Sequence, residues 1–346
     1  MKKEYTIDDI FGDSLNLKLD DSPVEKIEIE KQDESGKLVK VYEDGLEIIS
    51  DELMKKVKRK QLSASMVSGF AQCPADWLMN SFLLPDMDHE EPIYFARGHI
   101  FHDTMETFFN LAKEERTPQS LSQIAMKVIK KDYKEYLEDK ETMRWMQQAL
   151  KGYIEAGFEY KNVDVAQIVK DPEKGPEIGT ELFVKGKLGN TEREVVGFVD
   201  RVDQLPNGSL GIVDYKTGKK IQPFDPSKPI GDNNSFDYWR QQLAYTMLLE
   251  QEGHYIGGAK LEFPIAKGEV IVDVRNDYLR KQVEKDFERT DAALTKCIDE
   301  NFFPFHGHFF CKWCGMLSPH KHRVSRFGKL NVSWADVNQY VRLLDS

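Results

Sequence analysis

Two aspartates, Asp200 and Asp214, lie on either side of the turn sequence Pro206-Asn207-Gly208. Pro206 fits the first corner of a type I turn, and Gly208 supplies the left-handed residue that closes a three-residue hairpin. Leu205 then pairs with Ser209, so Asp200 faces Asp214 with β-carbons about 5 Å apart on one side of the sheet. A two-residue turn would instead shift the register by one and place the aspartates on opposite faces.

Lys216 shares the side of Asp214, because side chains two residues apart on a strand point the same way. Two facing carboxylates repel each other and one pKa rises, unless a cation lies between them. Mg²⁺ or Mn²⁺ suits such oxygen ligands, and either ion activates water and neutralises charge developing on a phosphate. Lys216 could assist as an ammonium or, with a lowered pKa, as an amine. The pattern predicts metal-dependent hydrolysis of phosphodiester bonds.

The competing interpretation is a surface hairpin whose Asp and Lys residues are simply solvated. The neighbouring apolar residues argue against it. Val196 and Phe198 are expected on the face of Asp200, and Leu210 and Ile212 on the face of Asp214. Charged groups buried together require a partner, which favours a functional site.

The elements that must hold these residues are readable from periodicity. A helix opens at Gly98 and carries His102 and Glu106 four apart, and a charged helical region covers about 119–160. Later segments predict strands at 181–188, 193–205, 210–216, 259–263 and 270–274, with helices at 236–250 and 279–298. This order predicts an α/β (α+β) fold, a mixed central sheet flanked by helices with an N-terminal helical part.

The run Gly-x-x-Asp-Arg-x-Asp, then a hairpin and Asp-Tyr-Lys-Thr-Gly, resembles motifs II and III of the PD-(D/E)XK nuclease superfamily, in its RecB-like branch. The segment from Gly98 to His102 resembles the upstream Gly-x-x-x-His helix of that branch. Glu181 lies where the branch often has a Glu, and Gln241 with Tyr245 resembles its Gln-x-x-x-Tyr helix. The likeness covers about residues 62–325 and implies a restriction-endonuclease-like fold.

The resemblance also implies roles for individual residues. Metal ligands would be His102, Asp200, Asp214 and the backbone carbonyl of Tyr215, while Lys216 would be the catalytic lysine, and Gln241 and Tyr245 would line the active site or the DNA strand. Without the resemblance, His102 is better explained as a hydrogen-bonded core residue, and Gln241 and Tyr245 as ordinary helix positions.

The four cysteines are too few for a disulfide framework. Many RecB-like nucleases hold an iron-sulfur cluster with one early and three late cysteines. Cys73 resembles the first position and Cys311 with Cys314 the later Cys-x-x-Cys, but His320 stands where the fourth cysteine is expected. A [4Fe-4S] cluster, a Zn²⁺ on the same residues, and no metal all remain open. Cys297 follows Leu294 by three and is expected to be a buried core thiol.

The charge distribution limits how the protein could bind DNA. The net charge of -11 disfavours a generally cationic DNA binder, yet the first 50 residues alone hold 14 acids against 7 lysines. Basic clusters at 55–60 and 321–329 could therefore still meet phosphate, or could be solvated surface.

We expect an acidic extension at 1–60, partly disordered or a small β element, a nuclease domain at 61–330 with a helical insertion at about 119–160, and a tail at 331–346. No segment predicts a membrane span or a signal peptide, so a cytoplasmic protein of a bacterial or phage-infected cell is expected.

The function that these features favour is a Mg²⁺- or Mn²⁺-dependent deoxyribonuclease. The preferred form is an exonuclease of recombination, repair or phage and mobile-element DNA. It would act on linear or single-stranded ends, and a helicase, a recombinase or a single-strand-binding protein would be its partner. One alternative is a CRISPR-adaptation-like or helicase-associated nuclease subunit, whose motor would be a separate chain because no Walker-type sequence occurs. A further alternative is an inactive DNA-binding module, which the complete set of acidic and basic positions disfavours.

Overall fold

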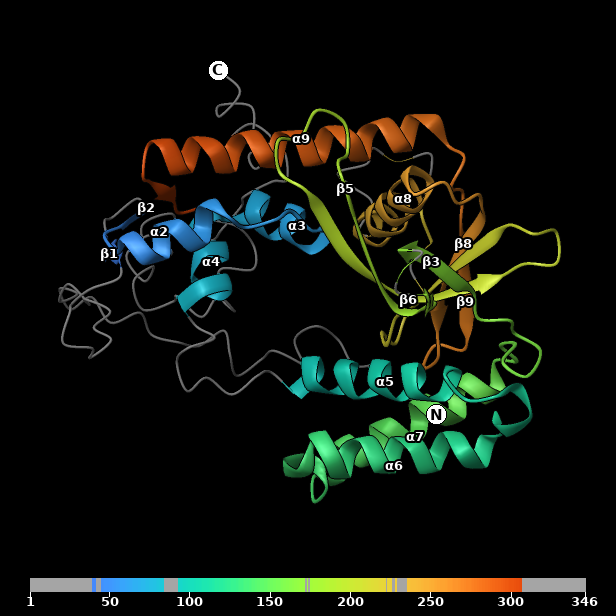
Figure 1. Ribbon diagram of the computed structural model, residues 1–346. Helices are drawn as coiled ribbons and strands as arrows, with labels where there is room; N and C mark the ends of the chain where they lie inside the picture. The colour runs from blue at the N-terminus through green and yellow to red at the C-terminus, as the bar shows by residue number, and fades with distance from the viewer. Residues whose placement is uncertain are drawn as a thin grey trace.

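The computed structural model describes residues 39–41, 45–83, 93–171, 173, 175–221, 223–225, 228 and 235–306. Helices lie on both sides of a twisted sheet, with a smaller group of elements at one end (Figure 1). Within the described part, none of the helices combines the length and apolar character that crossing a membrane requires.

The central sheet has five strands in the order β5-β6-β7-β8-β9. Their bounds are Thr180–Gly186, Val195–Gln204, Leu210–Tyr215, Ile256–Phe263 and Gly268–Val272. Strands β7 and β8 run parallel, because helix α8 (Phe236–Gln251) carries the chain back across the sheet, while the other neighbours are antiparallel. The predicted mixed sheet flanked by helices is confirmed.

The turn between β6 and β7 has the predicted register. Leu205 and Ser209 pair at its base, and Gly208 adopts φ 84°, the left-handed conformation that glycine favours. Asn207 closes the turn by accepting from the backbone N–H and the hydroxyl of Ser209. Further along, Gln204 pairs with Leu210, and the same register brings Asp200 opposite Asp214.

Helices α5 (Ile93–Phe109), α6 (Pro118–Asp132) and α7 (Lys140–Glu155) cover one face of the sheet. Helix α5 begins at Ile93, so the expectation that Gly98 opens this helix is wrong. Ala96 is buried, and Arg97 donates to Thr142 of α7, so tertiary contacts hold the first turns in place. The charged region predicted at 119–160 is the pair α6 and α7.

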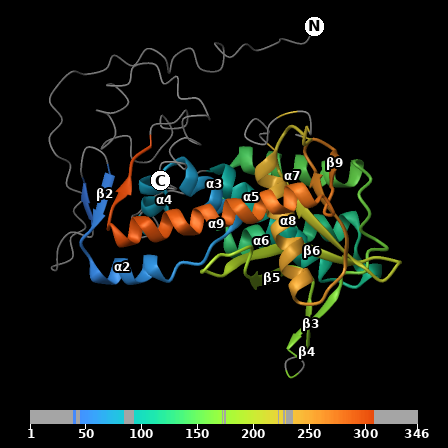
Figure 2. The same cartoon turned by 90° about the horizontal axis from the view of Figure 1, so that it is seen from above.

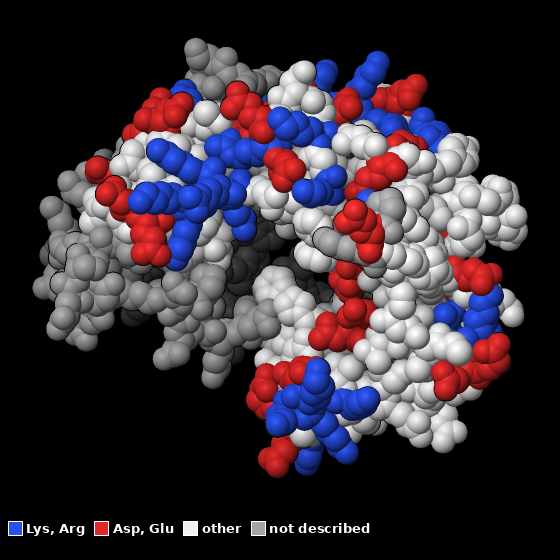
Figure 3. All heavy atoms as spheres, viewed as in Figure 1, with Lys and Arg blue, Asp and Glu red and all other residues white. Residues whose placement is uncertain are grey.

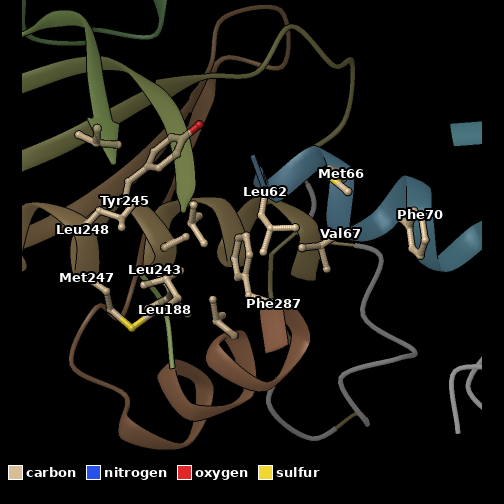
Figure 4. Packing of buried hydrophobic residues seen from close by; sticks show 14 of the residues in the cluster. Leu62, Met66, Val67, Phe70, Leu188, Leu243, Tyr245, Met247, Leu248 and Phe287 are labelled. Carbon is tan, nitrogen blue, oxygen red and sulfur yellow. The ribbon is translucent and has the colours of Figure 1, made fainter. Parts of the chain in front are cut away.

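The opposite face is covered by α8 together with α9 (Asp277–Asp299) and α3 (Ala64–Gln72). Seen from above, α9 runs along much of the molecule and crosses α8 (Figure 2). Leu62, Leu243 and Phe287 meet in the core between these helices and the sheet (Figure 4). Ser63 caps α3 by accepting a hydrogen bond from the Met66 backbone N–H.

The remaining elements join this core at the far end of α9. They are β1 (Val39–Val41), β2 (Gly45–Ile48), α2 (Asp51–Lys58), α4 (Pro74–Leu78), the π-helix Met79–Leu83 and β10 (Phe303–Pro304). Strand β2 pairs with both β1 and β10, and Leu46 and Val57 are fully buried. A small hairpin of β3 (Gln167–Asp171) and β4 (Gly175–Ile178) precedes β5, and short 3-10 turns lie at Lys113–Glu115 and Lys134–Tyr136.

Candidate active site

A histidine and two carboxylates meet where α5 reaches β5 and β6. His102 Nδ1 lies 3.3 Å from Asp200 Oδ2 and 3.9 Å from Glu181 Oε1. One nitrogen or oxygen from each of the three side chains lies within 4.8 Å of the others. Nitrogen and carboxylate oxygen are donors that a divalent cation accepts, so this group fits a metal ion.

Glu181 enters this group through an unusual backbone. Its φ is 45°, in the left-handed region that a non-glycine residue rarely adopts, and the strand register places it opposite Asp200. Strain of this kind persists only where the surroundings impose it. Resemblance alone pointed to Glu181, and the structure brings its carboxylate beside His102 and Asp200.

Asp214 and Lys216 form the other half of the site. Lys216 Nζ lies 2.7 Å from Asp214 Oδ2 and donates to Gln241 Oε1 at 2.9 Å. Gln241 in turn donates to the Tyr245 hydroxyl at 3.1 Å, one turn further along α8. The four side chains therefore form one connected chain, as a shared role predicts.

Asp214 is buried, and its Oδ1 has no hydrogen-bond partner among the described residues. A buried carboxylate oxygen without a partner is costly, so this atom fits a cation ligand. Asp214 lies outside the compact group of His102, Glu181 and Asp200. At Tyr215, the backbone N–H donates to Asp200 Oδ2 at 2.7 Å and fixes that carboxylate.

Mutual charge shifts the pKa values of these groups. Burial, opposed by Lys216 and reinforced by Asp200, raises the pKa of Asp214 to about 6. Burial lowers the pKa of His102, but Asp200 and Glu181 outweigh it and raise the value to about 10. Burial also acts to lower the pKa of Lys216, yet the two aspartates raise it overall. Without a metal, the imidazolium and the ammonium supply the positive charge; a bound metal would displace the imidazole proton.

Arg201, although adjacent to Asp200, points away from the site. It is 1% exposed, donates to Asp203 at 2.8 and 3.0 Å and to the Tyr215 hydroxyl at 2.6 Å, and its guanidinium lies 4.1 Å from the ring centroid of Phe109. Arg201 anchors the face of the sheet that α5 and α7 cover. This arginine of the Gly-x-x-Asp-Arg-x-Asp sequence therefore stabilises the fold.

The burial expected around Asp200 is only partly correct. Leu210 and Ile212 are buried as predicted, but Phe198 is 55% exposed and Val196 is half-buried. Gly197 and Val199 face α8 instead: a β-carbon on Gly197 would lie 2.2 Å from the Tyr245 ring, and Val199 is fully buried. Val199 and Asp200 are buried in succession, because helices cover both faces of the sheet at this point.

The cysteine site is only partly described. Cys73 is buried at the start of α4, and its Sγ accepts backbone N–H groups of Asp76 and His306 at 3.4 Å each. Cys311, Cys314 and His320 lie outside the described residues, as does the basic cluster at 321–329. Cys297 is buried on α9, as predicted.

Comparison with known proteins identifies the family. The family model described as the PD-(D/E)XK nuclease superfamily matches residues 61–318. The chain belongs to this superfamily. Its restriction-endonuclease-like sheet and the position of Asp200, Asp214 and Lys216 on the β6–β7 hairpin agree with the motif pattern from which the family was expected. Members of this superfamily use divalent metals, and His102, Glu181 and Asp200 offer a suitable set of ligand atoms.

Two solved structures resemble the chain at low identity. A candidate exonuclease from Eubacterium rectale is 14% identical with a TM-score of 0.48, covering 84% of this chain and 97% of its own. A protein named SSO0001 is 13% identical with a TM-score of 0.32, covering 82% of this chain and 98% of its own. No curated protein matches the sequence.

Proposed function

We propose that this protein is a Mg²⁺- or Mn²⁺-dependent deoxyribonuclease that hydrolyses phosphodiester bonds, acting as an exonuclease in recombination, repair or mobile-element DNA metabolism. The observation that carries the proposal is the group of side chains that α5, β5, β6 and the end of β7 bring together. It comprises a histidine with two carboxylates on one side and an aspartate bound to a lysine on the other. The family match supports a nuclease.

In this proposal, His102, Glu181, Asp200 and Asp214 would hold the metal, together with the backbone carbonyl of Tyr215. When bound, a divalent cation supplies Lewis-acid polarisation of the phosphate and a readily ionised water. The Tyr215 N–H keeps the Asp200 carboxylate in one orientation. Ligands that are already oriented need little rearrangement when metal and substrate arrive.

Lys216 is proposed as the catalytic cation. Gln241 restrains its ammonium from one side and Asp214 from the other, so the charge is fixed in direction. A fixed cation stabilises negative charge that develops on a phosphate oxygen in the transition state. Tyr245 holds Gln241 in turn and lines the site, while its own pKa, raised to about 12 mainly by burial, keeps the hydroxyl protonated.

The organisation of the chain stays part of the proposal: an N-terminal extension to about residue 60, a nuclease domain to about 330 and a short tail. The cysteine site, holding a [4Fe-4S] cluster or Zn²⁺ through Cys73, Cys311, Cys314 and His320, is likewise proposed. Absorption near 400 nm would support an iron cluster. A colourless preparation that contains zinc would support the second metal.

The test of function is hydrolysis of end-labelled linear DNA and of closed circular DNA with Mg²⁺ or Mn²⁺. Progressive shortening of the linear substrate, with the circle left intact, is expected for an exonuclease. Asp214→Asn and Lys216→Ala should abolish hydrolysis, whereas the exposed controls Asp299→Asn and Lys281→Ala should retain it. Unchanged digestion by both site variants would rule out this site.

A further inference from the structure

Next to the candidate active site, two phenylalanines pair across β5 and β6 and remain open to solvent. Phe183 lies opposite Phe198 in the ladder, with ring centroids 5.2 Å apart. Phe183 is 37% exposed and Phe198 is 55% exposed. Each lies two residues along its strand from a site carboxylate, Glu181 or Asp200, which is about 7 Å at the usual rise of a strand. The rings therefore adjoin the proposed metal site.

The two rings lie on the face of the sheet away from α8. Gly197 and Val199 on either side of Phe198 are turned toward α8 or buried, and Leu182 and Val184 flank Phe183 in the same way. Side chains alternate along a strand, so both phenylalanines point to the opposite face. His102 approaches Glu181 and Asp200 from α5, which covers that opposite face further along the strands. The aromatic pair therefore lies on the side of the sheet from which His102 enters the site.

Two lysines flank the aromatic pair, and each has a glutamate nearby. Lys185 is exposed, two residues beyond Phe183, and its Nζ lies 3.9 Å from Glu194 Oε1. Lys170 of β3 has its Nζ 6.0 Å from the Phe183 ring centroid and 3.0 Å from Glu177 Oε2. At the start of β6, Leu62 forms a bridge with Val195, which joins the end of α2 to this sheet.

Helix α2 and the residues after it carry the basic cluster at 55–60 that the sequence singled out. Lys55, Lys58 and Arg59 are exposed, and these charges gather over α2, beside the hollow between the upper elements and helices α5–α7 (Figure 3). The strand from Val195 to Asp200 spans about 17 Å, a length of about five stacked nucleotides at 3.4 Å each. Phosphates leaving the site along these strands would reach the basic cluster.

We propose that the outer face of β5 and β6 is a track for single-stranded DNA, in which Phe183 and Phe198 stack against bases and the lysines contact phosphates. This assignment rests on the proposed function. An exposed aromatic ring favours single strands, because the bases of a duplex stack on each other and present only their edges in the grooves. Stacking is indifferent to base identity, so the track selects strandedness and not sequence.

The test is the binding of a fluorescein-labelled single-stranded oligothymidylate and of a labelled hairpin duplex, measured by anisotropy with Ca²⁺ replacing Mg²⁺. Stacking contributes about 1–3 kcal/mol per base, so Phe198→Ala should weaken single-strand binding by about 5- to 150-fold. Duplex binding should change less than about twofold by the same argument. Phe198→Trp should retain single-strand binding. Tyr278→Ala, which removes a still more exposed aromatic on α9, should have no effect. Lys58→Ala should lower the salt slope of single-strand binding by about 0.7.

The track would be overturned if the wild type, Phe198→Ala and the double variant Phe183→Ala/Phe198→Ala bound single strands with equal affinity. It would also be overturned if the variants lost the same amount of affinity for single strands and for the duplex. A change of oligomeric state in Phe198→Ala without a change in DNA affinity would also overturn it, by assigning the rings to contact with a second copy. Hydrolysis is scored separately. A wild type that binds single strands through Phe198 but hydrolyses no DNA would refute the proposed function and leave the track standing.

Discussion

The buried arginine beside the site gives the sharpest prediction about stability. Arg201→Met keeps a long apolar stem but removes the guanidinium that pairs with Asp203 and lies 3.7 Å from Glu262 Oε1. Glu262 is 0% exposed and Asp203 is half-buried, so the variant leaves a fully buried carboxylate that pairs with Lys260 at 2.6 Å. The variant should fold but be markedly less stable.

The size of the effect follows from the kind of contact that is lost. Breaking a buried ion pair by removing one partner costs about 3–5 kcal/mol, because the other charge stays buried. The guanidinium also loses its contact with the Phe109 ring at 4.1 Å, worth about 1–2 kcal/mol in a dry setting. These contributions overlap, so we expect a loss of about 4 kcal/mol. For a chain of 346 residues, an entropy of unfolding of about 2.1 cal/mol/K per residue converts this loss into a fall in Tm of about 5–6 °C.

The assay is urea unfolding followed by tryptophan fluorescence for the wild type, Arg201→Met, Glu262→Gln and the double variant. The double variant removes both charges, so its loss should fall short of the summed single losses by about 2 kcal/mol. The midpoint should move while the slope with urea stays constant. Losses that simply add, or a loss below about 1 kcal/mol for Arg201→Met, would show that Arg201 does not anchor the sheet in this way.

Three further perturbations have definite expected outcomes. Gly197→Ala should push the Tyr245 ring aside, cost about 1–3 kcal/mol of unfolding free energy and lower hydrolysis. In a Tyr245→Ala background, the same Gly197→Ala change should cost less than about 0.5 kcal/mol, and an undiminished cost there would contradict the packing argument. The thiol of Cys297 has its pKa raised to about 12, mainly by burial, so at pH 8.5 it should resist alkylation in the folded protein and react after unfolding, as read by peptide mass spectrometry. Asn301→Ala removes the side chain that hydrogen-bonds to both the N–H and the carbonyl of Ile48, so it should lower the free energy of unfolding by about 1–3 kcal/mol. An unchanged urea midpoint would show that the strand ladder alone holds β2.

The hairpin that carries the two aspartates was predictable because its geometry is local. Pro206, Asn207 and Gly208 determine the turn, the turn determines the register, and the register places Asp200 opposite Asp214. Period-two and period-3.6 patterns likewise predicted the five strands of the central sheet and the helices α8 and α9, with bounds correct to within a few residues.

Two local predictions were wrong because distant contacts override local signals. The start of α5 moved from Gly98 to Ile93, where contacts with α7 hold the first turns. Phe198 is 55% exposed, because the burial of a strand residue depends on which helix covers that part of the sheet, and the turn sequence does not specify this.

By itself, the sequence determined which types of side chain the site contains and the hairpin that brings two of its acids together. A turn and the alternation of side chains along a strand depend on only a few neighbouring residues. Only the tertiary structure brought His102 and Glu181 to Asp200, turned Arg201 into a buried anchor, and joined Ile48 to Asn301 across 253 positions of the chain. Such contacts depend on how helices pack against a sheet, and packing depends on the combined shape of many side chains and not on the spacing of a few.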